Sequence, residues 1–285
     1  MGNISNPPEY TMQVKIAFII SLIVLSSLLF GADDIDDTAN VNVLIKQHGS
    51  SDWRLRQKAR ETLLCFSNEV GPLLIKTLKD KEATAEFKKQ LEMTLVLVNL
   101  KQKGINGGAA DKDLKIYLDT KKDSYVVGDK LELQVWIQNK LNKPATIVGS
   151  LDSSCTKRRK PYATFSILKP SGKPIEYPTC IECKLMNFLR MQDMIRVYPG
   201  EILDPYMKID GAGFFENYVV NTWTPDKPGK YSITFHYDST GPNEEWLDIN
   251  GCGEYSVHED DQIFKDIIRV KTDSNTLIID VKEKK

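Results

Sequence analysis

Residues 222–237 read TWTPDKPGKYSITFHY and hold a turn, a corner and a strand in one run. Asp226, Gly229 and Tyr231 have the D-x-x-G-x-Y spacing at which a tyrosine at the head of a sandwich strand hydrogen-bonds back to the corner before it. From Tyr231 to Tyr237, apolar residues alternate with polar ones, a period of two that turns one face of a strand to a core and the other to water. This stretch therefore predicts a β-sandwich.

Further strands are expected on both sides of this stretch. Residues 131–139 read LELQVWIQN, and every second residue from Leu131 to Ile137 is apolar. The other segments with strand character are 115–118, 165–168, 174–177, 266–270 and 276–281. Segments 165–168 and 174–177 are separated by Ser171-Gly172, which suits a turn between two strands.

Residues 125–139 carry the pattern Y-x-x-G-D-x-L-x-L-x-V-x-x-x-N. This pattern resembles the opening strands of bacterial immunoglobulin-like domains, including those similar to the BsuPI-type proteinase inhibitor. The family also has a strand, turn and strand that match 165–177, and a P-G-E element that matches 199–201. The resemblance covers most of 112–240 and implies an immunoglobulin-like antiparallel β-sandwich over residues 113–285. It implies no single activity, because such domains serve adhesion, assembly, inhibition and spacing.

From residue 41 to 100 the apolar period changes to that of a helix. Two stripes follow this period: Trp53, Leu55, Ala59 and Leu63, and then Phe87, Leu91, Leu95 and Val98. The Ser-Ser-Asp run at 50–52 supplies a cap for the first of these helices. Pro72 is expected to open the next helix, where its missing N–H costs nothing, and Gly104 is expected to end the last.

The helical segment also contains an internal repeat. Leu44-Ile45-Lys46 recurs as Leu74-Ile75-Lys76, and with a one-residue gap Lys58 and Glu61 recur as Lys89 and Glu92. The period of 30 to 31 residues resembles the HEAT family of paired helices, whose members bind proteins along a helical face. We assign residues 33–104 to a HEAT-like helical domain and the Gly- and Ala-rich residues 105–112 to a linker. Two units are too few to stand alone, so the pair should dock on the sandwich or on a partner.

Residues 16–30 form an uncharged, mainly apolar run between Lys15 and the acidic segment 33–37. Such a run predicts an export signal, so residues 1–32 are interpreted as a signal peptide or an N-terminal membrane anchor. A start at Met12 would give the short basic head that signals usually have. Fifteen residues fall short of the roughly 20 that a spanning helix needs, which favours cleavage, whereas Phe30 near the cleavage site favours retention. The expected location is periplasmic, cell-surface or secreted, with membrane contact only through residues 16–32.

The chain has five cysteines, which are Cys65, Cys155, Cys180, Cys183 and Cys252. Export favours disulfides among the last four, which lie in two long loops, 152–194 and 238–264. The first loop is basic and the second acidic, which favours a Cys155–Cys252 bridge beside a local Cys180–Cys183 ring. A zinc site formed by the four thiolates is the alternative. Cys65 is expected to be a small buried residue at a helix end, with an intermolecular disulfide as the alternative.

Charged and aromatic residues in the two loops suggest where a partner would bind. Lys157, Arg158, Arg159 and Lys160 form a basic cluster, but no aromatic residues interleave with it as a nucleic-acid site would require. The chain's net charge of −1 also argues against nucleic acid, so we expect a solvated or pair-forming loop. Trp246, in an otherwise polar loop, is the expected partner anchor, with core filling as the alternative. A calcium site at 248–254 fits no complete loop motif.

No catalytic motif occurs in the sequence. His48, His236 and His258 lie in no recognised nucleophile setting, and G-x-S-x-G, H-E-x-x-H and a phosphate loop are absent. An active site would have to consist of residues that only folding brings together. We therefore expect an exported, non-enzymatic protein, without a cofactor or metal, that binds another protein through its helical face and its disulfide-tied loops. A BsuPI-like proteinase inhibitor and a zinc module or metal-dependent enzyme remain open alternatives.

Overall fold

A computed structural model of the chain describes residues 37–108, 113–122, 124–149, 160–176, 191–205, 223–241 and 262–284. The helices are α2 (Asp37–His48), α3 (Trp53–Leu63), α4 (Ser67–Leu78), α5 (Ala85–Gln102) and the short α7 (Gln262–Lys265), with 3-10 turns at Leu64–Phe66 and Met191–Asp193. The strands are β1 (Leu114–Thr120), β2 (Tyr125–Val126), β3 (Leu133–Asn139), β4 (Ala145–Val148), β5 (Tyr162–Leu168), β6 (Met194–Val197), β7 (Ile202–Leu203), β8 (Gly229–Asp238), β9 (Lys271–Asp273) and β10 (Leu277–Lys282). The fold is mixed α plus β, and the described residues from Leu44 onward belong to one unit.

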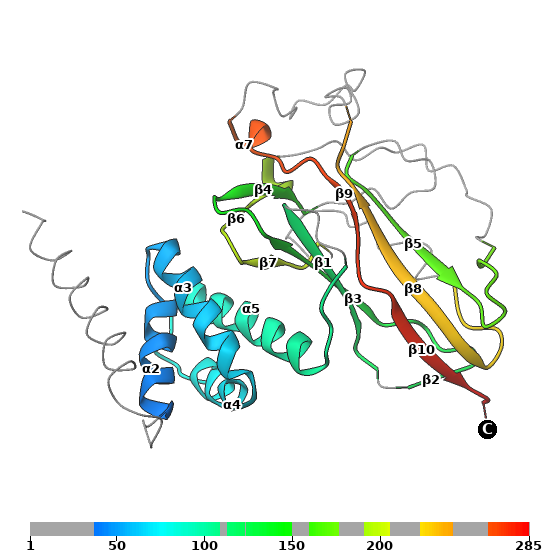
Figure 1. The fold of residues 1–285 in the computed structure, drawn as a ribbon, viewed down its shortest axis with the longest axis horizontal. Helices are drawn as coiled ribbons and strands as arrows, with labels where there is room; N and C mark the ends of the chain where they lie inside the picture. Colours follow the sequence, from blue (N-terminus) through cyan, green and yellow to red (C-terminus); the bar gives the residue numbers. More distant parts are fainter. Residues whose placement is uncertain are drawn as a thin grey trace, which may run out of the picture. The chain divides into compact units, whose positions relative to one another are not determined.

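Within the described ranges the strands form three sheets. Strands β1, β3 and β7 form the first, β2, β10, β8 and β5 form the second, and β4 pairs with β6 in the third. Strand β8 is the centre of the second sheet, since β5 runs along one side and β10 and then β9 run along the other (Figure 1). All these pairings are antiparallel except that of β10 with β2.

One hydrophobic core joins the first two sheets. Strands β1 and β3 contribute Leu114, Ile116, Leu118, Val135 and Ile137, and strands β5, β8 and β10 contribute Phe165, Ile167, Tyr231, Ile233, Phe235, Tyr237, Ile279 and Val281. The buried residues of β5 and β8 alternate with partly exposed ones, as the sequence predicts for strands with one face on a core. The two sheets therefore pack face to face across this cluster.

The corner before β8 has the hydrogen bonds that the D-x-x-G-x-Y spacing predicts. The Tyr231 hydroxyl lies 2.8 Å from the carbonyl oxygen of Lys227 and 3.2 Å from Oδ1 of Asp226, either of which accepts its proton. The same hydroxyl accepts the Lys227 N–H at 3.3 Å. Gly229 has φ +127°, and a Cβ there would lie 2.7 Å from the Pro170 side chain, so glycine is required. The predicted bond of Tyr231 to its corner is confirmed.

Two strand predictions are wrong. Residues 266–270 follow α7 and pair with β4 through a single bridge, between Ile267 and Thr146, while β9 begins at the next residue. Their side chains alternate only weakly and several are buried, so an apolar connection imitates a strand in the sequence. Of the predicted strand 174–177, the structure describes 174–176, which contribute one bridge, from Pro174 to Leu168, rather than a strand.

The helical predictions hold for α3 and α5 but need correction at α4. Asp52 caps α3, and its Oδ1 accepts the Arg54 N–H at 2.9 Å. Pro72 lies inside α4 and does not open it, because α4 already begins at Ser67. The fully buried Val70 precedes the proline, so the first turns of α4 are held by packing rather than by the proline's fixed φ.

The burial of equivalent positions corrects the predicted repeat. Ile45 in α2 and Leu74 in α4 are both buried and are 29 residues apart, whereas Ile75, the sequence match of Ile45, is 45% exposed. Buried Arg60 in α3 and Leu91 in α5 are 31 residues apart. The difference arises because residues 79–84 between α4 and α5 are two more than residues 49–52 between α2 and α3. The turn that joins α4 to α5 is therefore longer than the turn that joins α2 to α3.

Candidate functional site

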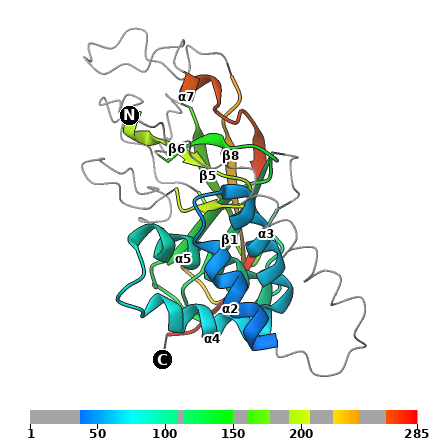
Figure 2. The ribbon, with the colours of Figure 1, turned by 90° about the vertical axis from the view of Figure 1, so that its left-hand side faces the viewer.

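Helix α5 packs directly on the three-stranded sheet. Leu97 and Leu100 of α5 form one buried cluster with Tyr117 of β1 and Ile202 of β7. Lys103, just after α5, places its Nζ 2.6 Å from Oδ2 of Asp119. Figure 2 shows α5 beside β1. The helices thus dock on the sheet, which is one of the two outcomes that the shortness of the repeat predicts.

A buried cluster of charged residues links α3 to the turn before β7. Arg60 is 2% exposed, and its guanidinium donates to the carbonyl oxygen of Pro199 at 3.3 Å and to Oε1 of Gln90 at 2.9 Å. Oε1 of Glu201 lies 3.6 Å from Nη2 of Arg56 and 3.9 Å from Nη2 of Arg60. Burial lowers the pKa of Arg60 to about 10, although the carboxylate of Glu201 opposes the shift. Glu201 therefore supplies the negative charge that makes two buried guanidinium groups tolerable.

The P-G-E element forms the turn that carries Glu201. Gly200 has φ +74°, and a Cβ there would lie 3.2 Å from a guanidinium nitrogen of Arg60. Oε2 of Glu201 accepts the Tyr198 N–H at 3.0 Å, which closes the turn. The Gly200 carbonyl accepts a hydrogen bond from the Gln138 side chain of β3 at 3.0 Å. The turn is therefore fixed to the sheet on one side and to α3 on the other.

His48 belongs to the same buried region and serves packing. Its Nε2 lies 3.1 Å from the Gln90 carbonyl oxygen and within hydrogen-bond distance of Oγ1 of Thr94. Burial, helped by the nearby charge of Arg60, lowers the pKa of His48 to about 4. At neutral pH the ring is uncharged, and its Nε2–H donates to the Gln90 carbonyl. The sequence places His48 at a helix end correctly, since it is the last residue of α2.

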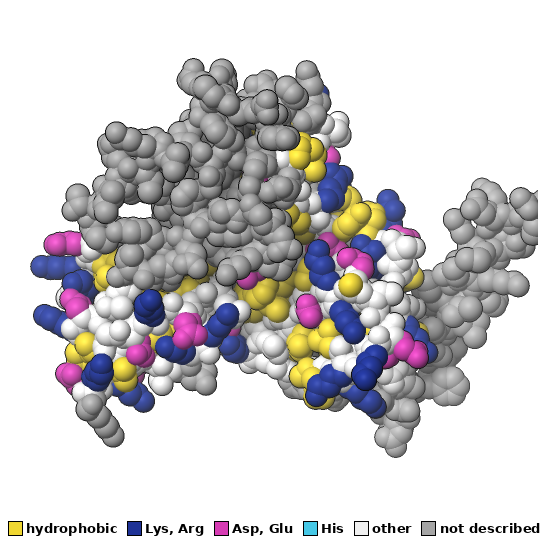
Figure 3. All heavy atoms as spheres, turned by 180° about the vertical axis from the view of Figure 1, so that it is seen from behind, with side chains coloured by type: hydrophobic (Ala, Val, Ile, Leu, Met, Phe, Trp, Pro, Cys, Tyr) yellow, Lys and Arg dark blue, Asp and Glu magenta, His cyan; other side chains and the backbone are white. Residues whose placement is uncertain are grey.

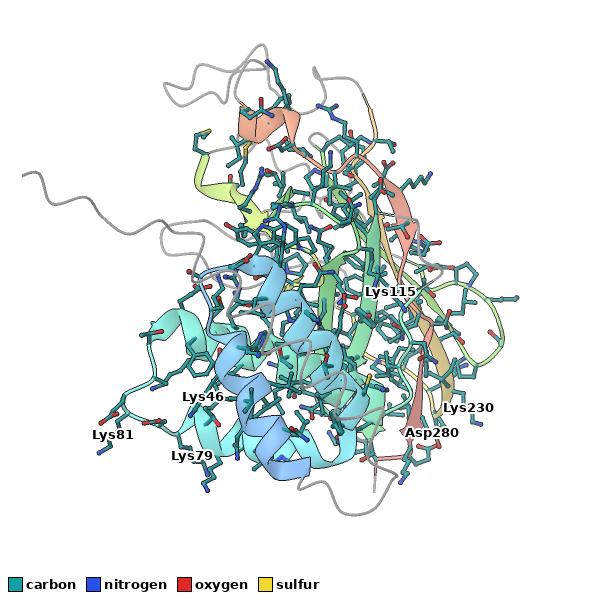
Figure 4. The ribbon with its side chains drawn as sticks, turned by 60° about the vertical axis from the view of Figure 1, so that its left-hand side comes forward. Lys46, Lys79, Lys81, Lys115, Lys230 and Asp280 are labelled. Carbon is teal, nitrogen blue, oxygen red and sulfur yellow. The ribbon has the colours of Figure 1, made fainter. Side chains whose placement is uncertain are left out.

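The outer side of the helical layer is basic. Residues 44–104 contain twelve Lys and Arg against seven Asp and Glu, although the whole chain is nearly neutral. Four exposed residues of α2, α4 and the C-cap of α4 define what we call the outer helical face: Lys46, Ile75, Lys76 and Lys79. Lys and Arg side chains occur on the helical part as well as on the sheet part in Figure 3, and in Figure 4 Lys46 and Lys79 project on the same side together with Lys81.

The second sheet brings together three residues that are far apart in the sequence. Oγ of Ser166 in β5 lies 2.7 Å from Nε2 of His236 in β8, and Nδ1 of His236 lies 2.7 Å from Oδ1 of Asp273 in β9. His236 faces outward as its strand period predicts. Its two neighbours were missed, because only the register of the three strands reveals them.

Among the residues singled out in the loops, the structure describes Lys160. It is 5% exposed, its Nζ lies 3.1 Å from Oδ2 of Asp238, and it sits over the ring of Tyr162. This ion pair agrees with the prediction of a pair-forming loop for Lys160. Little of the Lys160 side chain is accessible to an external ligand. The remaining residues lie outside the described ranges: Lys157, Arg158, Arg159, Cys155, Cys180, Cys183, Trp246, Cys252, His258, the calcium candidates at 248–254, and the export segment.

Cys65 is exposed and free, so the prediction of a buried cysteine is wrong. It follows α3 in a 3-10 turn, where its Sγ points to the Glu61 carbonyl on the polar side of the helix rather than into the core. Where the chain is described, His, Cys, Asp and Glu side chains form no group of three suited to a metal ion. In the same ranges, none of the helices has the length and hydrophobicity required to span a bilayer.

Comparison of the chain with protein-family models, with curated proteins and with solved structures finds no match.

Proposed function

We propose that this chain is an exported recognition protein that binds an acidic region of a partner protein through the outer helical face. The observation that carries the proposal is that one side of the helical layer contacts the sheet while the other side is exposed. Arg60 and the apolar side of α5 are occupied by the sheet and its turn. Lys46, Ile75, Lys76 and Lys79, on the opposite helices, are exposed.

Rigidity supports a binding role for this face. A surface that is already ordered loses less conformational entropy when a partner binds, so the same contacts give higher affinity. The Arg60 bonds to Pro199 and Gln90, and the Leu97 and Leu100 contacts, hold the helices in one position on the sheet. The outer helical face is thus a preorganised platform.

The composition of the face favours a protein over a nucleic acid. Lys76 and Lys79 lie one and four residues after the exposed Ile75, and Pro72 is exposed one turn before it. A mixed apolar and basic surface suits a protein partner that has an apolar anchor flanked by carboxylates. Binding of single-stranded nucleic acid would call for aromatic stacking platforms among the basic residues.

A photo-crosslinking experiment tests this proposal. p-Benzoylphenylalanine would replace Ile75 in the exported protein in its own cells, and in a matched variant it would replace Ile278, an exposed apolar residue of β10. We expect a discrete protein adduct from position 75, reduced about tenfold when Lys76 and Lys79 are changed to Glu, and no such adduct from position 278.

Two results would contradict the proposal. One is the same adducts from both positions, or no adduct from position 75. The other is binding of a fluorescent DNA duplex or heparin that the Lys76→Glu, Lys79→Glu variant loses, since that would identify a polyanion rather than a protein as the ligand.

The finer fold assignment and the export of the chain are part of the same proposal. Two sheets facing across one core and the Tyr231 corner support an immunoglobulin-like sandwich, and the two helix pairs with equivalent buried positions support a HEAT-like unit. Export predicts disulfides among the four loop cysteines. A thiol titration of the native protein should then detect one group, the exposed Cys65, while five in denaturant would contradict export with disulfides.

A further inference from the structure

The outward side of the second sheet holds a serine, a histidine and an aspartate in hydrogen-bonded series. His236 is directly opposite Asp273 on β9 and Thr164 on β5, and Ser166 is two residues further along β5 on the same face. The two hydrogen bonds, both 2.7 Å, use different ring nitrogens: Nε2 toward Ser166 and Nδ1 toward Asp273. With the proton on Nδ1 donated to Asp273, Nε2 is free to accept the proton of the serine hydroxyl.

This order of atoms is the one that activates a serine as a nucleophile. A serine hydroxyl becomes reactive when an adjacent base takes its proton and a third group holds that base in the correct tautomer. Ser166 is partly buried and faces outward, since its neighbours Phe165 and Ile167 point into the core. An electrophile from solution would approach it from the outer side of the sheet.

The residues around Ser166 indicate the class of substrate. Leu168 and Ile278 are both paired with Ser232, and both are exposed on the side of the sheet that carries Ser166. Two exposed aliphatic side chains near the nucleophile suit an apolar acyl group. Thr234 is directly opposite Ser166, and its hydroxyl lies 3.1 Å from that of Thr276, so hydroxyl donors are present for an oxyanion.

We propose that Ser166, His236 and Asp273 form an acyl-transfer site for esters with a short apolar acyl chain. Ser166 Oγ attacks the ester carbonyl carbon and its proton passes to Nε2 of His236. The tetrahedral oxyanion collapses, the alcohol leaves with the proton from Nε2, and the acyl group stays on Ser166. Water then attacks this ester with His236 taking its proton, so that the carboxylic acid is released and Ser166 is restored.

Covalent labelling tests the site on the full-length protein. The probe is a fluorophosphonate, which phosphonylates activated serines, and the labelled residue is identified by peptide mass spectrometry. A second assay follows hydrolysis of p-nitrophenyl butyrate. We expect the label on Ser166, its loss in Ser166→Ala, a labelling rate roughly 100-fold lower in His236→Gln, and about tenfold lower in Asp273→Asn.

The control is Ser171→Ala, which removes an exposed serine in the turn after β5 and should leave labelling and hydrolysis unchanged. Thermal unfolding of each variant verifies that the fold is retained. Asp273 acts through His236, so Asp273→Glu should recover part of the rate that Asp273→Asn loses. If the three residues only align β9 with β8, Asp273→Asn will lower the stability and Ser166 will stay unlabelled, which would overturn the proposal. A label on another residue, or hydrolysis that survives Ser166→Ala, would overturn it as well.

Discussion

Replacing Glu201 with Gln removes the negative charge that faces Arg56 and Arg60. Both guanidinium groups are buried, and Glu201 itself is 5% exposed, so water cannot enter easily to replace the lost charge. The amide keeps the shape of the carboxylate, which means that the change isolates charge rather than packing. Removal of one partner from a buried ion pair usually costs about 3–5 kcal/mol, because the other charge is left uncompensated.

The structure places the expected loss at the lower end of that range. The ion-pair distances of 3.6 and 3.9 Å are long, and Arg60 keeps its bonds to Pro199 and Gln90. We therefore expect Glu201→Gln to lower the free energy of unfolding by about 3 kcal/mol. For a domain of this size, that corresponds to a fall in Tm of roughly 6–12 °C.

Urea unfolding followed by circular dichroism measures this loss, with Glu132→Gln as the matched control. Glu132 pairs with Lys122 at 3.0 Å on the surface, and the same substitution there should cost less than about 1 kcal/mol. Adding Arg60→Met to Glu201→Gln should restore part of the stability, because it removes one of the uncompensated charges. A Glu201→Gln variant as stable as the control would refute the view that this cluster fixes the helices to the sheet.

Three further outcomes are expected. The pKa of His48 in the folded protein, about 4, lies below its unfolded value of 6.5. The contribution of the neutral ring to stability is therefore complete above pH 6.5 and is lost as the pH falls to about 4. In His48→Gln this part of the pH dependence of unfolding should disappear. Tyr231→Phe should cost about 1–2 kcal/mol in urea unfolding, because the corner loses its hydroxyl bonds. Gly200→Ala should lower the Tm more than Gly172→Ala, since both glycines have positive φ but only the first would place its Cβ near Arg60.

The sequence predicted those parts of the fold that depend on local pattern. Strand β8 alternates because one face is buried and the other is not, and the Tyr231 corner lies within a few residues of chain. The strand prediction for residues 266–270 is wrong because their apolar residues are buried in a connection between elements. An apolar pattern alone does not distinguish a buried connection from a strand.

The sites depend on contacts between distant segments, which a single sequence does not reveal. Arg56 and Arg60 look like the polar side of an amphipathic helix, but distant segments that include the turn of Glu201 and Gln90 of α5 help to bury them. Ser166 and His236 are 70 residues apart, and Asp273 is 37 residues beyond His236. Their contact follows from the register of the strands. The hydrophobic alternation predicts which face of a strand each side chain lies on, but it does not predict which residue of the neighbouring strand is opposite.

The central claim is that helices α3, α4 and α5 form one body with the sheets, within the unit that begins at Leu44 and contains the outer helical face. Trp53 in α3 lies 6.3 Å from the ring of Tyr198, and Trp223 lies 5.5 Å from the ring of Tyr231, so each reports on one part. Two variants, each keeping only one of these tryptophans, would be unfolded in urea and followed by fluorescence. The account predicts that each variant's fluorescence transition coincides with its own loss of total secondary structure. A Trp53 transition at clearly lower urea than the loss of the sheets would contradict it.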